Sequence, residues 1–230
     1  MSRRPADAKR RIIQAAYELF YRSGFARVSV DLIAEKAGFT KRTLYYHFES
    51  KDHLLAEVIR FHHGLAMERI RKWGDRIGGE PHAFLDSLFS HLADWAAKPR
   101  WAGPGFTRIV MELADLPGHP ARAIASRHKL TVETWLAHEF AAKGVSAPDQ
   151  LARQIVLLLE GSTALMLIHG DRRYARAAAE AAKTLAGTHA PPRRLAARER
   201  SSVSAPLEGA LATLAALAGR RRKRRLPSSR

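Results

Sequence analysis

The stretch from Ser29 to Leu55, SVDLIAEKAGFTKRTLYYHFESKDHLL, decides how the rest of the chain is interpreted. Its apolar residues recur at helical spacing in two short runs, 30–37 and 41–48, with Ser29 and Thr40 as candidate N-caps. Gly38 stands between the two runs. Because glycine adopts left-handed backbone freely, it allows two helices to cross steeply within three residues. The stretch therefore predicts a helix-turn-helix.

The second of these runs carries polar groups suited to nucleic acid. Leu44 and Phe48 are four residues apart, which places them on one face that we expect to be buried. The remaining positions offer cations, hydroxyls and an imidazole, groups that bind phosphate oxygens and base edges in a major groove. These positions are Lys41, Arg42, Thr43, Tyr45, Tyr46 and His47. For any single cation, a solvated surface charge is the alternative interpretation.

The run from Val28 to Leu55 resembles the DNA-binding signature of the TetR family of transcriptional regulators. The residues that carry the resemblance are Ile33-Ala34, Gly38, Thr43-Leu44-Tyr45-Tyr46-His47-Phe48 and Ser50-Lys51. Two positions depart from the usual pattern: Val28 stands where the family often has Thr, and Arg42 where a small residue is commoner. Arg42 bears on how closely that turn of helix approaches the DNA backbone, and it is itself a candidate contact.

The resemblance implies roles for individual residues. Phosphate contacts fall to Thr40, Thr43, Tyr45, His47 and Lys51, and base-edge contacts to Lys41, Thr43 and Tyr45. A flexible basic arm would add Arg3, Arg4, Lys9, Arg10 and Arg11. The family also implies a homodimer that binds a palindromic operator as double-stranded DNA. Most often such a protein is a repressor that a small organic ligand releases from the operator.

Helical periodicity continues beyond this stretch, and no strand-like alternation interrupts it. With Asp7 as N-cap and Gly24 after its end, the first helix is expected over 7–23, and in the second helix Leu32, Ile33 and Ala37 are expected to face inward. Further helices are expected over 51–73, 82–97, 106–116, 120–143, 149–169 and 171–186. The prediction is an all-α chain of about nine helices. It divides into a three-helix DNA-binding domain (1–51), a helical ligand-binding and dimerisation domain (52–189) and a basic tail (190–230).

The helices expected over 149–169 and 171–186 are the richest in apolar and alanine residues. Small residues let helices approach closely across a two-fold axis, so this pair predicts a dimer interface centred on residues such as Leu158 and Leu165. An ordinary core within one chain is the alternative.

A ligand pocket is expected between the middle helices, because these helices carry aromatic, sulfur-bearing and polar residues that could converge there. Glu160 sits within an apolar run, which favours an apolar, basic organic ligand. The candidate lining residues are Phe84, Leu88, His91, Trp95, Phe106, Val110, Met111, Trp135, Glu160 and Thr163. For most of them, a plain role in the core is the alternative.

Composition limits the remaining function classes. The net charge is +17, and 190–230 alone carries +9. Basic ends favour nucleic acid as partner, or merely confer solubility. With no cysteine, disulfides, thiolate catalysis and Cys-based metal sites are excluded. No HExxH, GxSxG or P-loop motif occurs, so we expect no metal, no cofactor and no enzyme.

The most apolar stretch, 155–168, is shorter than the ~20 residues of a membrane span, which favours a cytoplasmic protein without membrane contact. A nonspecific, architectural DNA-binding protein that uses both basic ends is the alternative function.

Overall fold

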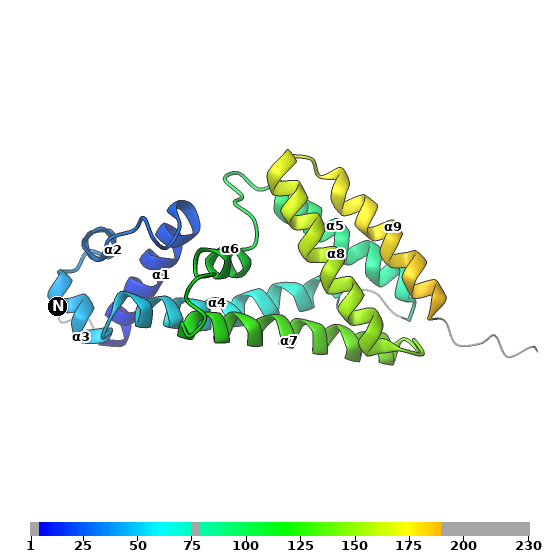
Figure 1. The fold of residues 1–230 in the computed structure, drawn as a ribbon, viewed down its shortest axis with the longest axis horizontal. Helices are drawn as coiled ribbons and strands as arrows, with labels where there is room; N and C mark the ends of the chain where they lie inside the picture. Colours follow the sequence, from blue (N-terminus) through cyan, green and yellow to red (C-terminus); the bar gives the residue numbers. More distant parts are fainter. Residues whose placement is uncertain (1–4, 75–78, 190–230) are drawn as a thin grey trace, which may run out of the picture. The chain divides into compact units, whose positions relative to one another are not determined.

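A computed structural model of the protein describes residues 5–74 and 79–189, and within these ranges the chain forms nine α-helices and no strand (Figure 1). The all-α prediction is confirmed. The helices are α1 (Pro5–Ser23), α2 (Val30–Ala37), α3 (Lys41–His47), α4 (Lys51–Gly74), α5 (Pro81–Ala96), α6 (Gly105–Glu112), α7 (Pro120–Ala142), α8 (Pro148–His169) and α9 (Arg173–Thr188). The predicted tail, 190–230, lies outside the described residues.

Local capping makes the helix-turn-helix. The Ser29 side chain accepts a hydrogen bond from the Leu32 amide at 3.1 Å, and the Thr40 hydroxyl accepts one from the Thr43 amide at 3.2 Å. Gly38 ends α2 with φ of 72°, in the left-handed region. Its amide and that of Phe39 close the turn on α2 carbonyls at 3.0 and 2.9 Å. The predicted helix-turn-helix is thereby confirmed.

Three expected details were wrong. Asp7 lies in the first turn of α1 rather than at its N-cap, because the helix already begins at Pro5. Leu32 is 42% exposed, because the inward face of α2 consists of Ile33, Ala34 and Ala37. The helix expected over 106–116 ends at Glu112.

The buried side chains fall into two clusters. The first, here called the N-terminal core, contains residues of α1–α4 together with Ile109 and Leu113 near α6 and Ala121 and Ile124 of α7. The second, the C-terminal core, is built from α4, α5, α7, α8 and α9.

Helix α4 contributes to both clusters. Leu54, Leu55 and Ile59 from its N-terminal half belong to the N-terminal core. Met67, from its C-terminal half, belongs to the C-terminal core, and Ile70 packs against it. The helix that follows the helix-turn-helix therefore also contributes to the C-terminal core, and Figure 1 shows it running alongside α7.

Helix α8 is unusually apolar. By length and composition it could span a membrane, and 33% of its most apolar 18-residue window is buried. One such helix is also what a soluble helical protein uses in its core, and α8 packs against α7 and α9.

The turn at Gly38 gives a test of this local structure. Replacing Gly38 by Ala should lower the free energy of unfolding by about 1–2 kcal/mol, because an L-residue is strained at that φ. The matched control is Gly64→Ala in the interior of α4, where an added Cβ meets no atom within 4 Å. That substitution should stabilise the protein by about 0.5–1 kcal/mol. Urea unfolding of both variants checks this, and equal stability of Gly38→Ala and the parent chain would contradict the assigned turn.

Candidate functional site

Helix α3 is anchored by two buried side chains and exposes its polar face to solvent. Leu44 and Phe48 are 0% and 1% exposed and belong to the N-terminal core. Tyr46 is 81% exposed and Tyr45 46%. Such exposure of tyrosines on a short, firmly anchored helix leaves their rings and hydroxyls available to a partner.

Neighbouring groups already orient several of the predicted DNA-contact residues. The Lys41 ammonium donates to Asp31 Oδ2 at 3.0 Å, which ties the start of α3 to α2. The hydrogen bond and charge of Asp31 raise the pKa of Lys41, so the side chain stays cationic. The hydroxyls of Thr40 and Thr43 lie 2.9 Å apart. Arg42 is exposed.

The other two predicted contacts are half-buried. The His47 ring meets the Tyr46 ring edge-on, with centroids 5.1 Å apart. Lys51 begins α4 and places its ammonium 4.2 Å from the centroid of the Phe25 ring. Burial lowers the pKa of Lys51, although the negative charges of Asp52 and Glu112 act in the opposite direction. All eight predicted residues therefore lie on α3 or at the helix ends beside it.

The expectation of a flexible basic arm fails for three of its five residues. Lys9, Arg10 and Arg11 lie within α1. Lys9 pairs with Glu57 at 2.8 Å, and the Arg11 guanidinium donates to the Ala37 carbonyl at 2.8 Å, where it caps α2. These contacts fix the two side chains within the domain. Arg3 and Arg4 lie outside the described residues.

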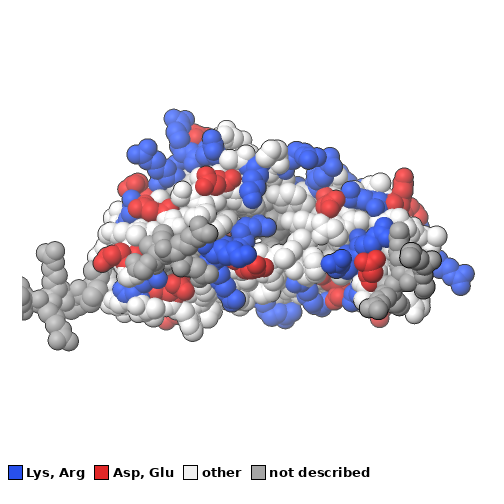
Figure 2. Space-filling view, turned by 180° about the vertical axis from the view of Figure 1, so that it is seen from behind, with Lys and Arg blue, Asp and Glu red and all other residues white. Residues whose placement is uncertain are grey.

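Charge is mixed over much of the surface. Figure 2 shows Lys and Arg side chains interspersed with Asp and Glu on the face that it draws. Since many of these cations are paired locally, net charge by itself does not single out a binding surface there.

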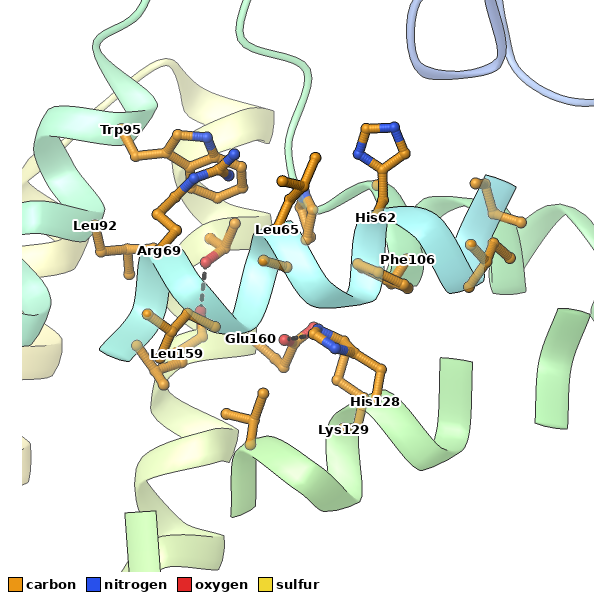
Figure 3. Close-up of a pocket in the computed structure, with 18 of the residues that line it drawn as sticks. His62, Leu65, Arg69, Leu92, Trp95, Phe106, His128, Lys129, Leu159 and Glu160 are labelled. Atoms are coloured by element: carbon orange, nitrogen blue, oxygen red, sulfur yellow. Dashed lines mark hydrogen bonds and ion pairs between the residues drawn. The ribbon is translucent and has the colours of Figure 1, made fainter. Parts of the chain in front are cut away.

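A second site is a cavity of about 140 Å³ around α4 (Figure 3). Residues of α1, α4, α5, α6, α7 and α8 line it, most of them apolar or aromatic. Its aromatic lining consists of Tyr17, Tyr21, Trp73, Trp95 and Phe106. Its polar lining consists of His62, Arg69, His128, Lys129, Glu160 and Thr163 together with the two tyrosine hydroxyls.

The structure brings together half of the ten residues expected in a pocket. Leu88, Trp95, Phe106, Glu160 and Thr163 line the cavity. The other five lie elsewhere: Phe84 and Trp135 in or against the C-terminal core, Met111 69% exposed, Val110 half-buried on α6, and His91 bonded to Ser87 on α5.

Sequence reasoning missed the contributions of α1 and α4. Tyr17 and Tyr21 come from α1, the helix that precedes the helix-turn-helix. On α4, His62, Arg69 and Trp73 follow one another at spacings of seven and four residues, which places them on one face. That spacing was readable in the sequence. What the sequence did not show is that this face borders a cavity.

Glu160 is compensated within the cavity wall. Its carboxylate accepts a hydrogen bond from the Thr107 hydroxyl at 2.7 Å and forms an ion pair with Lys129. The expectation of a basic ligand rested on the position of Glu160 within an apolar run, and the pairing with Lys129 leaves that carboxylate already compensated.

The two histidines of the cavity are neutral at pH 7. Burial, and after it the charge of Arg69, lowers the pKa of His62 to about 4. Burial lowers the pKa of His128 to about 3, with smaller effects from Lys129 and His63. His128 also stacks on Phe106, with ring centroids 4.0 Å apart. Within residues 5–74 and 79–189, no cluster of three or more His, Asp or Glu side chains has the spacing of a metal site.

Comparison with known proteins supports the interpretation of the N-terminal part. The sequence model of the family described as "Bacterial regulatory proteins, tetR family" matches residues 12–58. The chain is 32% identical over 75 residues to the uncharacterized HTH-type transcriptional regulator YerO of Bacillus subtilis, and the match covers 33% of this chain and 26% of YerO. It is 22% identical over 165 residues to the HTH-type transcriptional regulator AcrR of Shigella flexneri, covering 67% and 74% of the two chains.

Solved structures extend the likeness to the whole described fold. One is a TetR-family transcriptional regulator of Streptomyces coelicolor, with a TM-score of 0.72, 20% identity, and coverage of 81% of this chain and 97% of the other. Another is a putative TetR transcriptional regulator of Streptomyces avermitilis, with a TM-score of 0.65, 28% identity, and coverage of 76% and 98%. The resemblance seen in the sequence is confirmed: the family model matches residues 12–58, and the solved structures share the fold.

The neutral state of His128 predicts acid sensitivity. Because its pKa is depressed in the folded protein, the stability it confers is complete above the unfolded value of 6.5 and is lost as the pH falls toward about 3. The pH dependence of unfolding between pH 6.5 and 4.5 should therefore be flatter in His128→Gln, by at most about 1.4 kcal/mol per pH unit. The matched control is His82→Gln, at an exposed position of α5. Parallel profiles for His128→Gln and the parent chain would refute the assignment.

Lys41 and Tyr45 provide the test of the DNA-binding helix. Changing either to Ala should weaken binding to the preferred site about tenfold or more, as expected for one lost base or phosphate contact. Lys72→Ala is the control for Lys41→Ala, because it removes the same charge at a position about 32 Å along α4 from Lys51. Titrations of one labelled site at fixed salt measure this. Unchanged affinity in both α3 variants would overturn the assignment.

Proposed function

We propose that this chain, which belongs to the TetR family of bacterial regulatory proteins, is a homodimeric repressor that a small organic ligand releases from a palindromic operator. The observation that carries the proposal is the double use of α4. The helix follows the DNA-reading motif directly and also walls the cavity. In such a protein, residues 1–51 read the DNA and residues 52–189 bind the ligand and the second copy.

The proposed DNA contacts follow from exposure and position. Tyr45 and Lys41 project from α3 and serve as base-edge contacts, with Thr43 beside them. Thr40 caps α3, His47 ends it and Lys51 begins α4. These three are assigned to phosphates, with Thr43 and Tyr45 shared between the two roles. Arg42 and Tyr46 are exposed on the same helix and complete the surface.

The proposed dimer interface is the outer face of α8 and α9. Leu157 and Ile168 on α8 are 68% and 71% exposed, and Leu165 is 37% exposed. Gly161 and Ala164 lie exposed between them, and the exposed face of α9 carries Ala177, Ala181 and Thr184. An apolar surface with small residues on two adjacent helices is well suited to close packing against a second copy. Leu158, which we expected at the interface, packs partly against the C-terminal core instead.

Contacts between α1 and the cavity wall offer a route by which a bound ligand would act on DNA binding. Tyr21 of α1 lines the cavity, and its hydroxyl donates to the Gly103 carbonyl at 3.1 Å. Arg108 of α6 donates to the Tyr21 carbonyl at 2.8 Å. A ligand that shifts α4 or the start of α6 would therefore also shift α1. In a dimer this would change the spacing of the two reading helices, and a ligand that prefers one spacing shifts the equilibrium toward it.

A regulator of this kind acts in the cytoplasm, where its DNA is. The strongly basic tail, 190–230, would add phosphate contacts that do not depend on sequence. A nonspecific architectural protein would use the same basic ends, and what separates the two functions is sequence preference.

Loss of the dimer should weaken DNA binding. The double variant Leu157→Glu, Ile168→Glu places four carboxylates in the interface and should yield monomers, with operator affinity reduced about a hundredfold because the second reading helix is no longer tethered. Both positions are exposed, so folding should be preserved. Sedimentation and DNA titration measure the two effects.

The matched control is Leu130→Glu on α7, which is 57% exposed and lies outside the α8–α9 face. It should remain dimeric with normal affinity. An intact dimer in the double variant would refute the interface, and a monomer with full operator affinity would refute the dimeric mode of DNA binding.

A further inference from the structure

The charged side chains that line the cavity carry a net positive charge. With His62 and His128 neutral, the charged side chains lining it are Arg69, Lys129 and Glu160. Lys129 and Glu160 are paired, and Thr107 completes the hydrogen bonding of the carboxylate. Arg69 therefore supplies the net positive charge of the lining.

Arg69 has an aromatic neighbour in place of an acidic one. Its guanidinium lies 5.9 Å from the centroid of a Trp95 ring, and Figure 3 shows the two side chains beside each other, apart from the Lys129–Glu160 pair. Among the described residues, no carboxylate lies within 4.0 Å of the Arg69 guanidinium. Its charge acts inside the cavity, because it lowers the pKa of His62 and opposes the rise in the pKa of Tyr17 that burial causes.

A second polar group in the lining lacks a partner. His62 Nε2 is buried and makes no hydrogen bond to any described residue. A neutral imidazole can carry its proton on this nitrogen and donate it. Because a buried polar group without a partner is costly, a ligand atom that accepts from His62 would gain affinity.

The size and lining of the cavity set the rest of the ligand. A dry cavity of about 150 Å³ accommodates a benzene ring, and the volume here is about 140 Å³. Tyr17, Trp73, Trp95 and Phe106 offer ring faces and edges to an aromatic group. Arg69 is itself exposed, so an acidic group bound to it keeps some hydration while the ring is buried.

From this arrangement we infer that the ligand class is an aromatic carboxylate, with the carboxylate on Arg69 and the ring among the aromatic residues between α1, α4, α5 and α6. The inference deepens the proposed function and rests on it only in regarding this cavity as the regulatory site. The inferred ligand is acidic, whereas Glu160 in the sequence had indicated a basic ligand.

Three probes of one shape test the charge preference directly. These are 3-phenylpropionate, 3-phenylpropionamide and 3-phenylpropylammonium, which share a ring and chain and differ in charge. Their dissociation constants for the full chain are measured without DNA, from the fluorescence of the tryptophans near the cavity and from calorimetry. The anion should bind about tenfold more tightly than the amide, and the cation most weakly.

Two variants should move this preference in opposite directions. Arg69→Gln should weaken anion binding about tenfold and leave amide binding within about twofold. Glu160→Gln leaves Lys129 uncompensated and should strengthen anion binding. Arg71→Gln is the matched control, because it removes an exposed cation from the same helix outside the cavity lining.

The outcomes separate this inference from the proposed function. Tightest binding of the cation, an anion preference that survives Arg69→Gln, or no binding of any probe at millimolar concentrations would overturn the ligand class. Anion binding that requires Arg69 but leaves operator affinity unchanged would support the ligand class and count against ligand-controlled release. Release of DNA by the cation alone would count against the ligand class and support ligand-controlled release.

Discussion

One uninterrupted helix, α4, connects the helix-turn-helix to the cavity. Over 24 residues it extends about 36 Å, from Lys51 beside the DNA-reading helix to the cavity wall at Arg69 and Trp73. Its side chains are buried in both cores, so neither core can repack without moving the other. A packed helix moves as a unit, because its backbone hydrogen bonds and buried contacts resist local bending. In the proposed regulator, this constraint on α4 would give a ligand in the cavity a physical means of acting on α3.

With one exception, the charged side chains that line the cavity are paired with a group of opposite charge. The acidic and basic groups near the cavity are paired, as Glu160 is with Lys129, and the buried imidazoles of His62 and His128 are kept neutral by burial. Arg69 is the exception among the described residues that line the cavity. Arg69 is exposed, so water can hydrate its charge, and its place beside an aromatic ring in the cavity lining is the feature that distinguishes this cavity from an ordinary packing defect.

The parts of the fold that the sequence predicted well are those set by local interactions. The helix-turn-helix depends on two N-caps, one glycine and the apolar pair Leu44 and Phe48, all within twenty residues of one another. Where these local signals were ambiguous, prediction failed: the preceding proline moved the start of α1 ahead of Asp7, and a small residue, Ala34, took the inward place expected for Leu32.

The cavity was only half predictable, because its walls come from six helices. Aromatic residues such as Trp95 and Phe106 could be nominated from their type, but Phe84 and Trp135 are of the same type and fill the C-terminal core. The fate of Glu160 depended on Lys129, one helix away in the chain. The role of Arg11 likewise depended on the Ala37 carbonyl, which packing brings to it. Tertiary contacts of this kind leave no periodic trace in a single sequence.

The measurement that most directly tests a sequence-reading regulator is the ratio of two affinities at one salt concentration. The full chain selects its preferred site from a pool of random DNA, and its affinity for that site is then compared with its affinity for unselected DNA of equal length. A regulator that reads base edges through α3 should select an inverted repeat with half-sites about 34 Å apart and prefer it about 10³-fold or more. No recovered consensus, or a ratio near one, would contradict this and identify a nonspecific DNA-binding protein.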